Sequence, residues 1–259
     1  MKAGLNLYSL RKFTRTEEDF LDTAKKLKAM GYDYAQFSGA PMSSELADMI
    51  ARVSAQADLP IYLTHCPLDR VIKDTEKLME EHAKFGCTNI GIGGLPNPIV
   101  VDEKQCKETY DKLNLVAEKM QKNGYKFFYH NHHKEFWKYE NGDTPFEYML
   151  NNTPNINFTV DTYWLQYGGV DVVDFLEKLK GRIECVHLKD YKQSYNEETT
   201  IMQPRFAPVG DGTMNFPKIV SKMEELGVKY YFVEQDDAIN YPDPFEQVER
   251  SIRYIKTRL

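Results

Sequence analysis

The chain has 259 residues, with 33 basic and 39 acidic side chains and a formal net charge of -6. This acidic balance, without a basic stripe of interleaved aromatic residues, argues against nucleic acid as a partner. Hydrophobic residues make up 42% of the chain, but no apolar run approaches the ~20 residues of a membrane span, so we expect no membrane partner.

The first residues, MKAGLNLYSLR, enter a strand-like pattern at once and lack the apolar stretch of a secretory signal. A cytoplasmic location is therefore expected. The four cysteines stand far apart, without the C-x-x-C spacing of a zinc site, and we interpret them as reduced and structural. They are Cys66, Cys87, Cys106 and Cys185.

One pattern recurs along the chain: an amphipathic helix, a glycine, and a short run of β-branched and aromatic residues. Glycine just past a helix end supplies the left-handed backbone that ends the helix, so each instance marks a helix-to-strand junction. The junction glycines are Gly31, Gly86, Gly124, Gly181 and Gly227. Five such junctions predict a repeated β-α architecture.

Taken in order, strands are expected at residues 3–7, 34–37, 61–64, 89–92, 126–129, 157–160, 184–186 and 230–233. Helices are expected at residues 17–30, 43–57, 71–85, 103–123, 145–151, 172–180, 216–226 and 244–258. This alternation over residues 1–259 predicts an α/β fold, a single-domain (β/α)8 TIM barrel. An open doubly wound sheet would show the same alternation, because periodicity does not reveal closure.

The longest irregular stretch is residues 192–215, which contain Pro204, Pro208, Gly210 and Gly212. Structureless loops of this length inside compact domains are usually functional. We therefore expect a lid or a substrate wall after the seventh strand.

Barrel enzymes draw their catalytic groups from the carboxyl ends of several strands. That rule selects Tyr8, His65, His130, His132, Asp161, His187, Lys189, Glu234 and Asp236. Asp161 and His187 end neighbouring strands of one β-α-β unit, so they should emerge side by side. With Glu234 they form a mixed carboxylate and imidazole set that suits Mn²⁺, Zn²⁺, Co²⁺ or Fe²⁺. His130 and His132 alternate onto one face, and either is a fourth ligand candidate.

Each of these residues also has a purely structural interpretation. Asp161 is positioned to cap the following helix, and His187 could be a buried histidine hydrogen-bonded to Asp190. Trp164 fits rim packing as well as a platform on which a sugar would stack. We expect His82 and His133 on the surface.

Five motifs carry a family resemblance. They are NLYSLR, YHNHHKEF, VDTYWLQYGGVDVVDFLEKLKGRIECVHLKDY, VGDGTMNF and YYFVEQDD. In this order the chain resembles the sugar phosphate isomerase/epimerase proteins of the xylose isomerase-like TIM-barrel superfamily. The resemblance implies a divalent metal, often Mn²⁺, held by residues from strands five to eight, and Asp161, His187 and Glu234 match the last three positions.

The first of those positions departs from the family pattern. Ketose 3-epimerases have a glutamate at the end of strand five, whereas this chain has His130 within YHNH. The resemblance therefore implies a histidine ligand, with Glu135 as another candidate. Loss of one of two facing glutamates argues against simple two-base epimerisation, and the catalytic base could be Glu234, His130 or Lys189.

These observations predict a metal-dependent sugar or keto-sugar isomerase or epimerase that works through an enediolate. Tyr8, His65, His132, Trp164 and Asp236 are the expected substrate contacts. The alternatives are a lyase or dehydratase on a 3-keto-glycoside or keto-inositol, a sugar-binding barrel without chemistry, and an endonuclease at abasic sites, which the charge disfavours. Barrels that resemble this chain commonly pair through their loop faces, so a homo-oligomer is possible.

Overall fold

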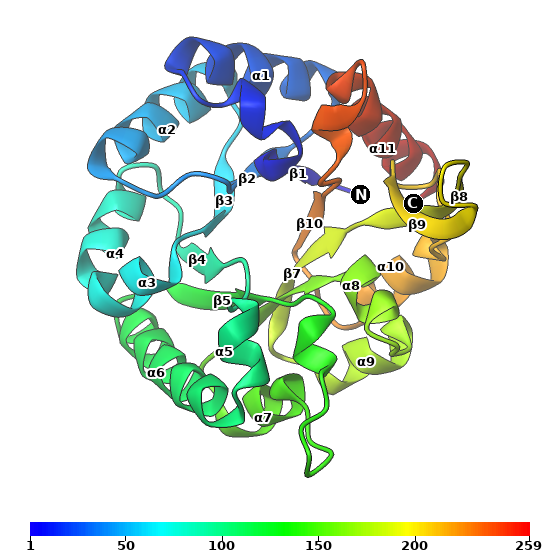
Figure 1. Cartoon of the computed structure of the whole chain (residues 1–259). Helices are drawn as coiled ribbons and strands as arrows, with labels where there is room; N and C mark the ends of the chain where they lie inside the picture. Colours follow the sequence, from blue (N-terminus) through cyan, green and yellow to red (C-terminus); the bar gives the residue numbers. More distant parts are fainter.

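The structure, a computed structural model, describes residues 1–259. Its centre is a closed barrel of eight parallel strands (Figure 1) in the order β1-β10-β7-β6-β5-β4-β3-β2. These strands are β1 (Gly4–Asn6), β2 (Tyr34–Phe37), β3 (Ile61–His65), β4 (Asn89–Ile92), β5 (Lys126–His130), β6 (Asn157–Asp161), β7 (Ile183–Leu188) and β10 (Tyr230–Val233). The predicted (β/α)8 barrel is confirmed.

The barrel closes where its first strand meets its last. Gly4 of β1 pairs with Phe232 of β10, and Leu5 pairs with Val233. The other edge of β1 pairs with β2, so no strand of the barrel is left with an open edge. Closure excludes the open doubly wound sheet.

Helices surround the barrel on its outer side (Figure 1). The α-helices are α1 (Glu17–Met30), α2 (Ser44–Ala57), α3 (Leu68–Lys73), α4 (Thr75–Ala83), α5 (Asn97–Val101), α6 (Glu103–Lys122), α7 (Pro145–Asn152), α8 (Thr162–Tyr167), α9 (Val172–Lys178), α10 (Phe216–Glu225) and α11 (Pro244–Arg258). Three short 3-10 helices are η1 (Leu7–Phe13), η2 (Lys134–Phe136) and η3 (Ala238–Asn240). None of the helices has both the length and the apolar character that crossing a membrane would require.

The sequence signals for helix ends hold in the structure. Thr16 caps α1 through its side chain, which accepts a hydrogen bond from the Asp19 amide, and Gly31 ends the same helix with φ of 101°. The other four junction glycines also have positive φ angles. Caps of this kind satisfy backbone groups that a helix end leaves unpaired.

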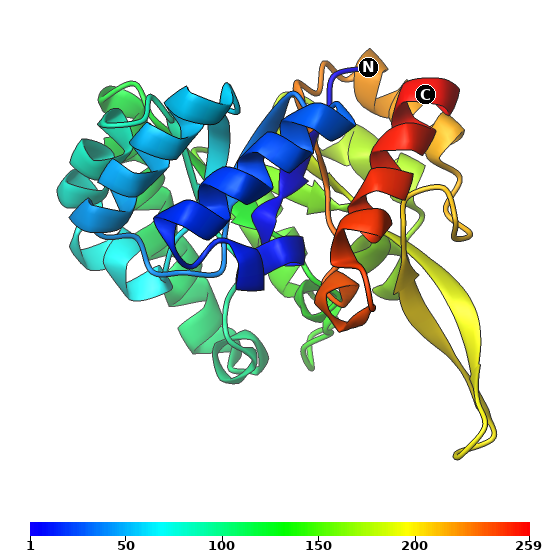
Figure 2. The ribbon, with the colours of Figure 1, turned by 90° about the horizontal axis from the view of Figure 1, so that it is seen from above.

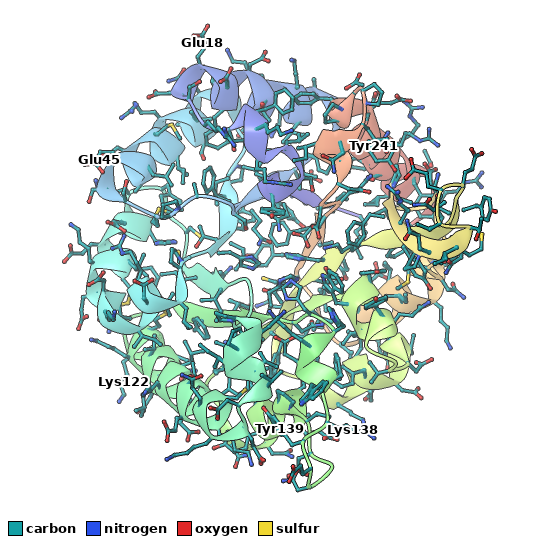
Figure 3. All side chains as sticks on the ribbon, in the orientation of Figure 1. Glu18, Glu45, Lys122, Lys138, Tyr139 and Tyr241 are labelled. Atoms are coloured by element: carbon teal, nitrogen blue, oxygen red, sulfur yellow. The ribbon has the colours of Figure 1, made fainter.

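Apolar side chains form two layers of core. The larger cluster lies between the strands and the helices, and a smaller one fills the inside of the barrel below the carboxyl ends of the strands. The inner cluster contains Tyr34, Leu63, Phe128, Cys185 and Phe232. Side chains fill the space enclosed by the strands, whereas charged residues such as Glu18 and Lys122 point outward (Figure 3). The inner apolar layer thus supports the polar side chains at the carboxyl ends of the strands.

The stretch expected to be one irregular loop after the seventh strand is instead mostly a hairpin. Strands β8 (Asp190–Asn196) and β9 (Ile201–Ala207) pair antiparallel and extend beyond the rest of the molecule, away from the chain termini (Figure 2). Pro204 sits in β9 opposite Gln193, where a free two-stranded ribbon tolerates the missing amide.

Two further expectations needed correction. The predicted helix at residues 71–85 is divided into α3 and α4 by Asp74, whose φ of -122° is not helical. The short helices α5 and α8 were not predicted. All four cysteines are buried and unpaired, as expected.

Candidate metal centre

Four potential ligands meet at the carboxyl ends of neighbouring strands. His130 ends β5, Asp161 ends β6, His187 lies in β7, and Glu234 directly follows β10. Asp161 and His187 stand directly opposite each other in the β6–β7 register, as the β-α-β argument predicted. The donor atoms of the four residues all lie within 4.8 Å of one another, and all four side chains are buried.

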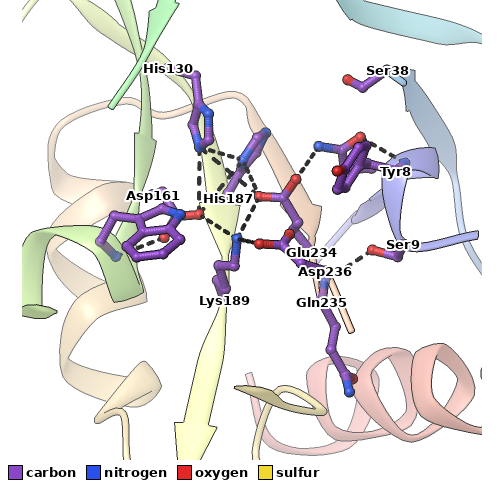
Figure 4. Close-up of polar contacts among 12 residues, drawn as sticks. Tyr8, Ser9, Ser38, His130, Asp161, His187, Lys189, Glu234, Gln235 and Asp236 are labelled. Carbon is purple, nitrogen blue, oxygen red and sulfur yellow. Dashed lines mark hydrogen bonds and ion pairs between the residues drawn. The ribbon is translucent and has the colours of Figure 1, made fainter. Parts of the chain in front are cut away.

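The cluster is tightest around His187 (Figure 4). Its Nδ1 atom lies 2.9 Å from Oε2 of Glu234 and 3.2 Å from Nε2 of His130. Nε2 of His130 in turn lies 3.5 Å from Oδ2 of Asp161. Two nitrogens and two oxygens therefore point at one small volume.

Asp161 has a different task at each of its carboxylate oxygens. Oδ1 accepts a hydrogen bond of 3.0 Å from the Trp164 amide and so caps α8. Oδ2 is buried and has no hydrogen-bond partner. Burial raises the pKa of Asp161 to about 7, and the nearby Glu234 carboxylate adds to the increase although Lys189 opposes it. The structural interpretation and the ligand interpretation thus apply to the same residue.

Glu234 is held in place by an asparagine from the first strand. Asn6 donates a 2.5 Å hydrogen bond to Oε1 of Glu234, which leaves Oε2 toward the cluster. Burial alone would raise the pKa of Glu234, but His187 and Lys189 outweigh it and keep it well below its usual range. Asn6 was missed in the sequence; its only signal was its place before the predicted rim residue Tyr8.

Lys189 brings an ammonium group to the edge of the cluster. Its side chain is fully buried, and Nζ lies 2.8 Å from Asp236, 3.3 Å from Glu234 and 3.6 Å from Asp161. Burial would lower the pKa of Lys189, but these carboxylates outweigh it and raise the pKa. The lysine therefore stays protonated at neutral pH.

Aromatic side chains cover the same lysine from the other side. Nζ of Lys189 lies 5.1 Å from the ring centre of Trp164 and 4.8 Å from that of Phe206 in β9. Such rings stabilise a cation and keep water away from it. Phe206 was hidden in the stretch that was expected to be irregular.

Three histidines of the site, His65, His130 and His132, are neutral at physiological pH. Burial lowers the pKa of His65 and His132 to about 3 and that of His130 well below its ordinary value. Neutral imidazole is the form that binds a metal or accepts a proton.

A pocket of about 280 Å³ opens onto the cluster. It is lined by Asn6, Tyr8, Ser38, Gly39, His65, Gly93, His130, His132, Lys189, Glu234 and Asp236. Four of the five predicted substrate contacts line it. The fifth, Trp164, does not; it packs against His132 and beneath Lys189 instead.

Several alternatives from the sequence are resolved by geometry. Glu135 lies outside the ligand group, where it accepts hydrogen bonds from the Tyr129 hydroxyl and the His132 amide. Asp190 does not pair with His187 and instead accepts bonds from backbone amides of the segment after β9. His82 is fully buried, so its predicted surface position was wrong, whereas His133 is exposed.

The family model described as xylose isomerase-like TIM barrel matches residues 24–258. Among curated proteins, the chain is 27% identical over 244 residues to an inosose dehydratase of Clostridium perfringens, covering 83% of this chain and 78% of that protein. It is 26% identical over 171 residues to an inosose dehydratase of Geobacillus kaustophilus, covering 59% of this chain but only 55% of that protein.

A solved structure supports the same fold. A sugar phosphate isomerase/epimerase of Parabacteroides distasonis superimposes with a TM-score of 0.83 at 24% identity. The superposition covers 99% of this chain and 94% of that one.

Proposed function

Because the chain belongs to the xylose isomerase-like TIM barrel family, we propose that it is a metal-dependent enzyme acting on a sugar or keto-sugar. The observation that carries the proposal is the buried group of His130, Asp161, His187 and Glu234. The relatives named inosose dehydratases favour a polyhydroxylated ketone as the substrate class.

The four residues fit a divalent cation. Oδ2 of Asp161 is buried without a hydrogen bond, and the Lys189 ammonium 3.6 Å away is shared with Glu234 and Asp236. A further cation would offset the cost of burying this oxygen, and the mixed nitrogen and oxygen set suits Mn²⁺, Zn²⁺, Co²⁺ or Fe²⁺. When bound, such an ion supplies a Lewis acid that stabilises the enediolate formed by removal of a carbon-bound proton. His130 is assigned here as a ligand.

Glu234 and Lys189 are assigned the proton transfers. Glu234 is ionised, is held by Asn6 through Oε1 and lines the pocket, so this ligand is also assigned as the base that removes the proton next to the ketone. Lys189 keeps its proton and can donate it to a departing hydroxyl group or hold the developing negative charge.

The position of these two groups favours elimination. Nζ of Lys189 and Oε2 of Glu234 are 3.3 Å apart, so the acid and the base serve the same side of a bound ring. A proton and a β-hydroxyl that leave from one face need this arrangement. Epimerisation instead needs groups on two opposite faces, and strand five supplies His130 where a second glutamate would stand. A lyase, specifically a dehydratase of a keto-inositol or a 3-keto-glycoside lyase, is therefore the favoured reaction.

Isomerisation or epimerisation is the second candidate. His132 lines the pocket with a neutral imidazole and lies outside the ligand group. A neutral histidine placed there could remove a proton from the face that Glu234 does not reach, and Lys189 on the other face could supply the proton that replaces it.

Mass spectrometry of the product tests these proposals. We expect Mn²⁺-loaded protein to convert an inosose to a product that has lost water, or a 3-keto-glycoside to a product that has lost the alcohol of its glycosidic bond. A product of unchanged mass but altered retention would support the second candidate. Binding without turnover across a panel of keto-sugars would overturn both, and would leave a sugar-binding barrel.

A further inference from the structure

Gln36 in β2 links two histidines of the site from inside the barrel. Its side chain is fully buried. The amide oxygen Oε1 lies 2.7 Å from Nε2 of His187, and the amide nitrogen Nε2 lies 3.1 Å from Nε2 of His65. The same nitrogen donates a 3.1 Å hydrogen bond to the Ser38 hydroxyl. Both amide atoms of Gln36 are thus engaged.

The two ends of an amide impose opposite requirements on their partners. The oxygen only accepts hydrogen bonds and the NH₂ group only donates them. Nε2 of His187 must therefore carry a hydrogen, and Nε2 of His65 must present a lone pair. An imidazole that binds a cation is neutral and has a single N–H, so in the cation-bound form Nδ1 of His187 is left with the lone pair that faces the cation, and Nδ1 of His65 with a hydrogen.

The Nδ1 atoms of His187 and His65 both face the site. Nδ1 of His187 faces the ligand group, 2.9 Å from Oε2 of Glu234 and 3.2 Å from Nε2 of His130. Nδ1 of His65 lies beside Gly93 in the pocket wall, and a Cβ added at Gly93 would stand 3.6 Å from it. Glycine at this position leaves that nitrogen uncovered.

We propose that Gln36 is a positioning residue that sets the tautomers of His187 and His65 together. In His187 it keeps the Nδ1 lone pair available to a cation. In His65 it makes Nδ1–H a hydrogen-bond donor to a substrate oxygen, so His65 binds substrate and does not remove a proton. The inference rests on the proposed function and goes beyond it, because it assigns a role to a side chain that touches neither cation nor substrate.

The reversed amide would have the opposite effect. With NH₂ toward His187, the hydrogen of that ring would move to Nδ1, and the lone pair that faces the ligand group would be lost. Loss of the group that hydrogen-bonds the other nitrogen of a metal-binding histidine typically changes metal affinity roughly 10- to 100-fold. The orientation of one buried amide therefore has a measurable consequence.

Nitrogen-15 NMR of histidine-labelled protein loaded with Zn²⁺ tests the tautomers directly in the wild type. We expect a directly bonded hydrogen on Nε2 of His187 and on Nδ1 of His65. A hydrogen on Nε2 of His65 would overturn the inference, whatever the variants do.

Titration calorimetry with Zn²⁺ provides the second test. Gln36→Leu should bind Zn²⁺ roughly 10- to 100-fold more weakly. Gln36→Glu still accepts from His187 and should bind at least as tightly as wild type, while the hydrogen of His65 moves to Nε2. Gln235→Leu is the matched control, because this buried glutamine bonds Asp237 and Gln247 and points away from the ligands (Figure 4).

The outcomes separate this inference from the proposed function. Tight Zn²⁺ binding by wild type, with equal affinity in Gln36→Leu, would overturn the role of Gln36 alone. Failure of the wild type to bind any divalent cation would overturn the proposed function itself.

Discussion

At the residue scale, Asp161 separates a structural role from a ligand role within one side chain. Asn is as good a helix cap as Asp, whereas Ala is not. Asp161→Asn should therefore keep the thermal stability of the metal-free protein but lose bound metal, because the amide carries no charge for the cation. Asp161→Ala should lose the metal and about 1 kcal/mol of stability as well. Metal analysis and thermal unfolding of both variants measure these effects; full metal content in either variant would contradict the assignment.

Lys189 is expected to affect turnover without supporting metal binding. Lys189→Met removes the proton donor, so turnover should fall about 10²- to 10⁴-fold. Affinity for Mn²⁺ should stay the same or rise, because a positive charge beside the ligand group is gone. Steady-state kinetics and calorimetry check the two halves. Lys192→Met, exposed on the hairpin without an ion pair, is the control and should match wild type.

His82 predicts a pH dependence of stability. Its ring contacts Thr64 at 2.7 Å and the Leu78 carbonyl at 2.6 Å, and burial lowers its pKa from the ordinary 6.5 to about 4. As pH falls through this window the unfolded state takes up the proton first. The contribution is complete above pH 6.5 and is lost toward pH 4, at most about 3 kcal/mol.

Denaturant unfolding between pH 7 and pH 4 measures that contribution. The free energy of unfolding should fall less steeply in His82→Gln than in wild type. His133→Gln is the control, since this histidine is exposed and its pKa is lowered less than that of His82. Equal slopes for wild type and His82→Gln would contradict the account.

The ligands could be predicted from the sequence because each follows a short apolar run that indicates a strand. Asp161 and His187 follow apolar runs on either side of one helix, and strand order alone makes them neighbours. Asn6 and Gln36 carry no such signal. Their partners, Glu234 and His187, lie far away in the sequence and become neighbours only in the folded barrel. The polar residues that position the ligands therefore could not be predicted from the sequence.

At the element scale, the hairpin β8–β9 has a base and a tip with different expected roles. Phe206 at the base covers Lys189, whereas Tyr195, Ile201 and Met202 near the tip are exposed. Replacing residues 195–202 by Asn-Gly joins the paired Ser194 and Gln203 through a two-residue turn. Turnover and metal content should survive this change, because no site residue is touched.

Phe206→Ala provides the contrast. Water would reach the Lys189 ammonium and weaken its interactions with the carboxylates, so turnover should fall while the hairpin remains folded. Kinetics and circular dichroism of both variants check this. If removal of the tip abolished activity while Phe206→Ala kept it, the assignment of different roles to the base and the tip would be wrong.

The strands of the hairpin, β8 and β9, could not be predicted from the sequence. The exposed residues of a free ribbon need no apolar alternation, and Pro204 argued against a strand. The barrel strands were placed to within two residues at their ends, because each has an inner and an outer face to bury.

At the scale of the whole molecule, closure is what assembles the site. Pairing of β1 with β10 brings Asn6 to Glu234, residues separated by most of the chain. The alternation of strands and helices predicted both the barrel and the edge where ligands meet, but it carried no information on closure. Only the closed barrel places side chains from β1, β2, β5, β6 and β7 around one point.

Deuterium exchange tests the central claim, a cation held by four residues and required for removal of a carbon-bound proton. The rate of exchange next to the ketone of an inosose in D₂O would be followed by NMR before and after metal removal. We predict exchange with the metal-loaded protein, loss of exchange on chelation and recovery with Mn²⁺. Exchange that continues unchanged in metal-free protein would contradict the account.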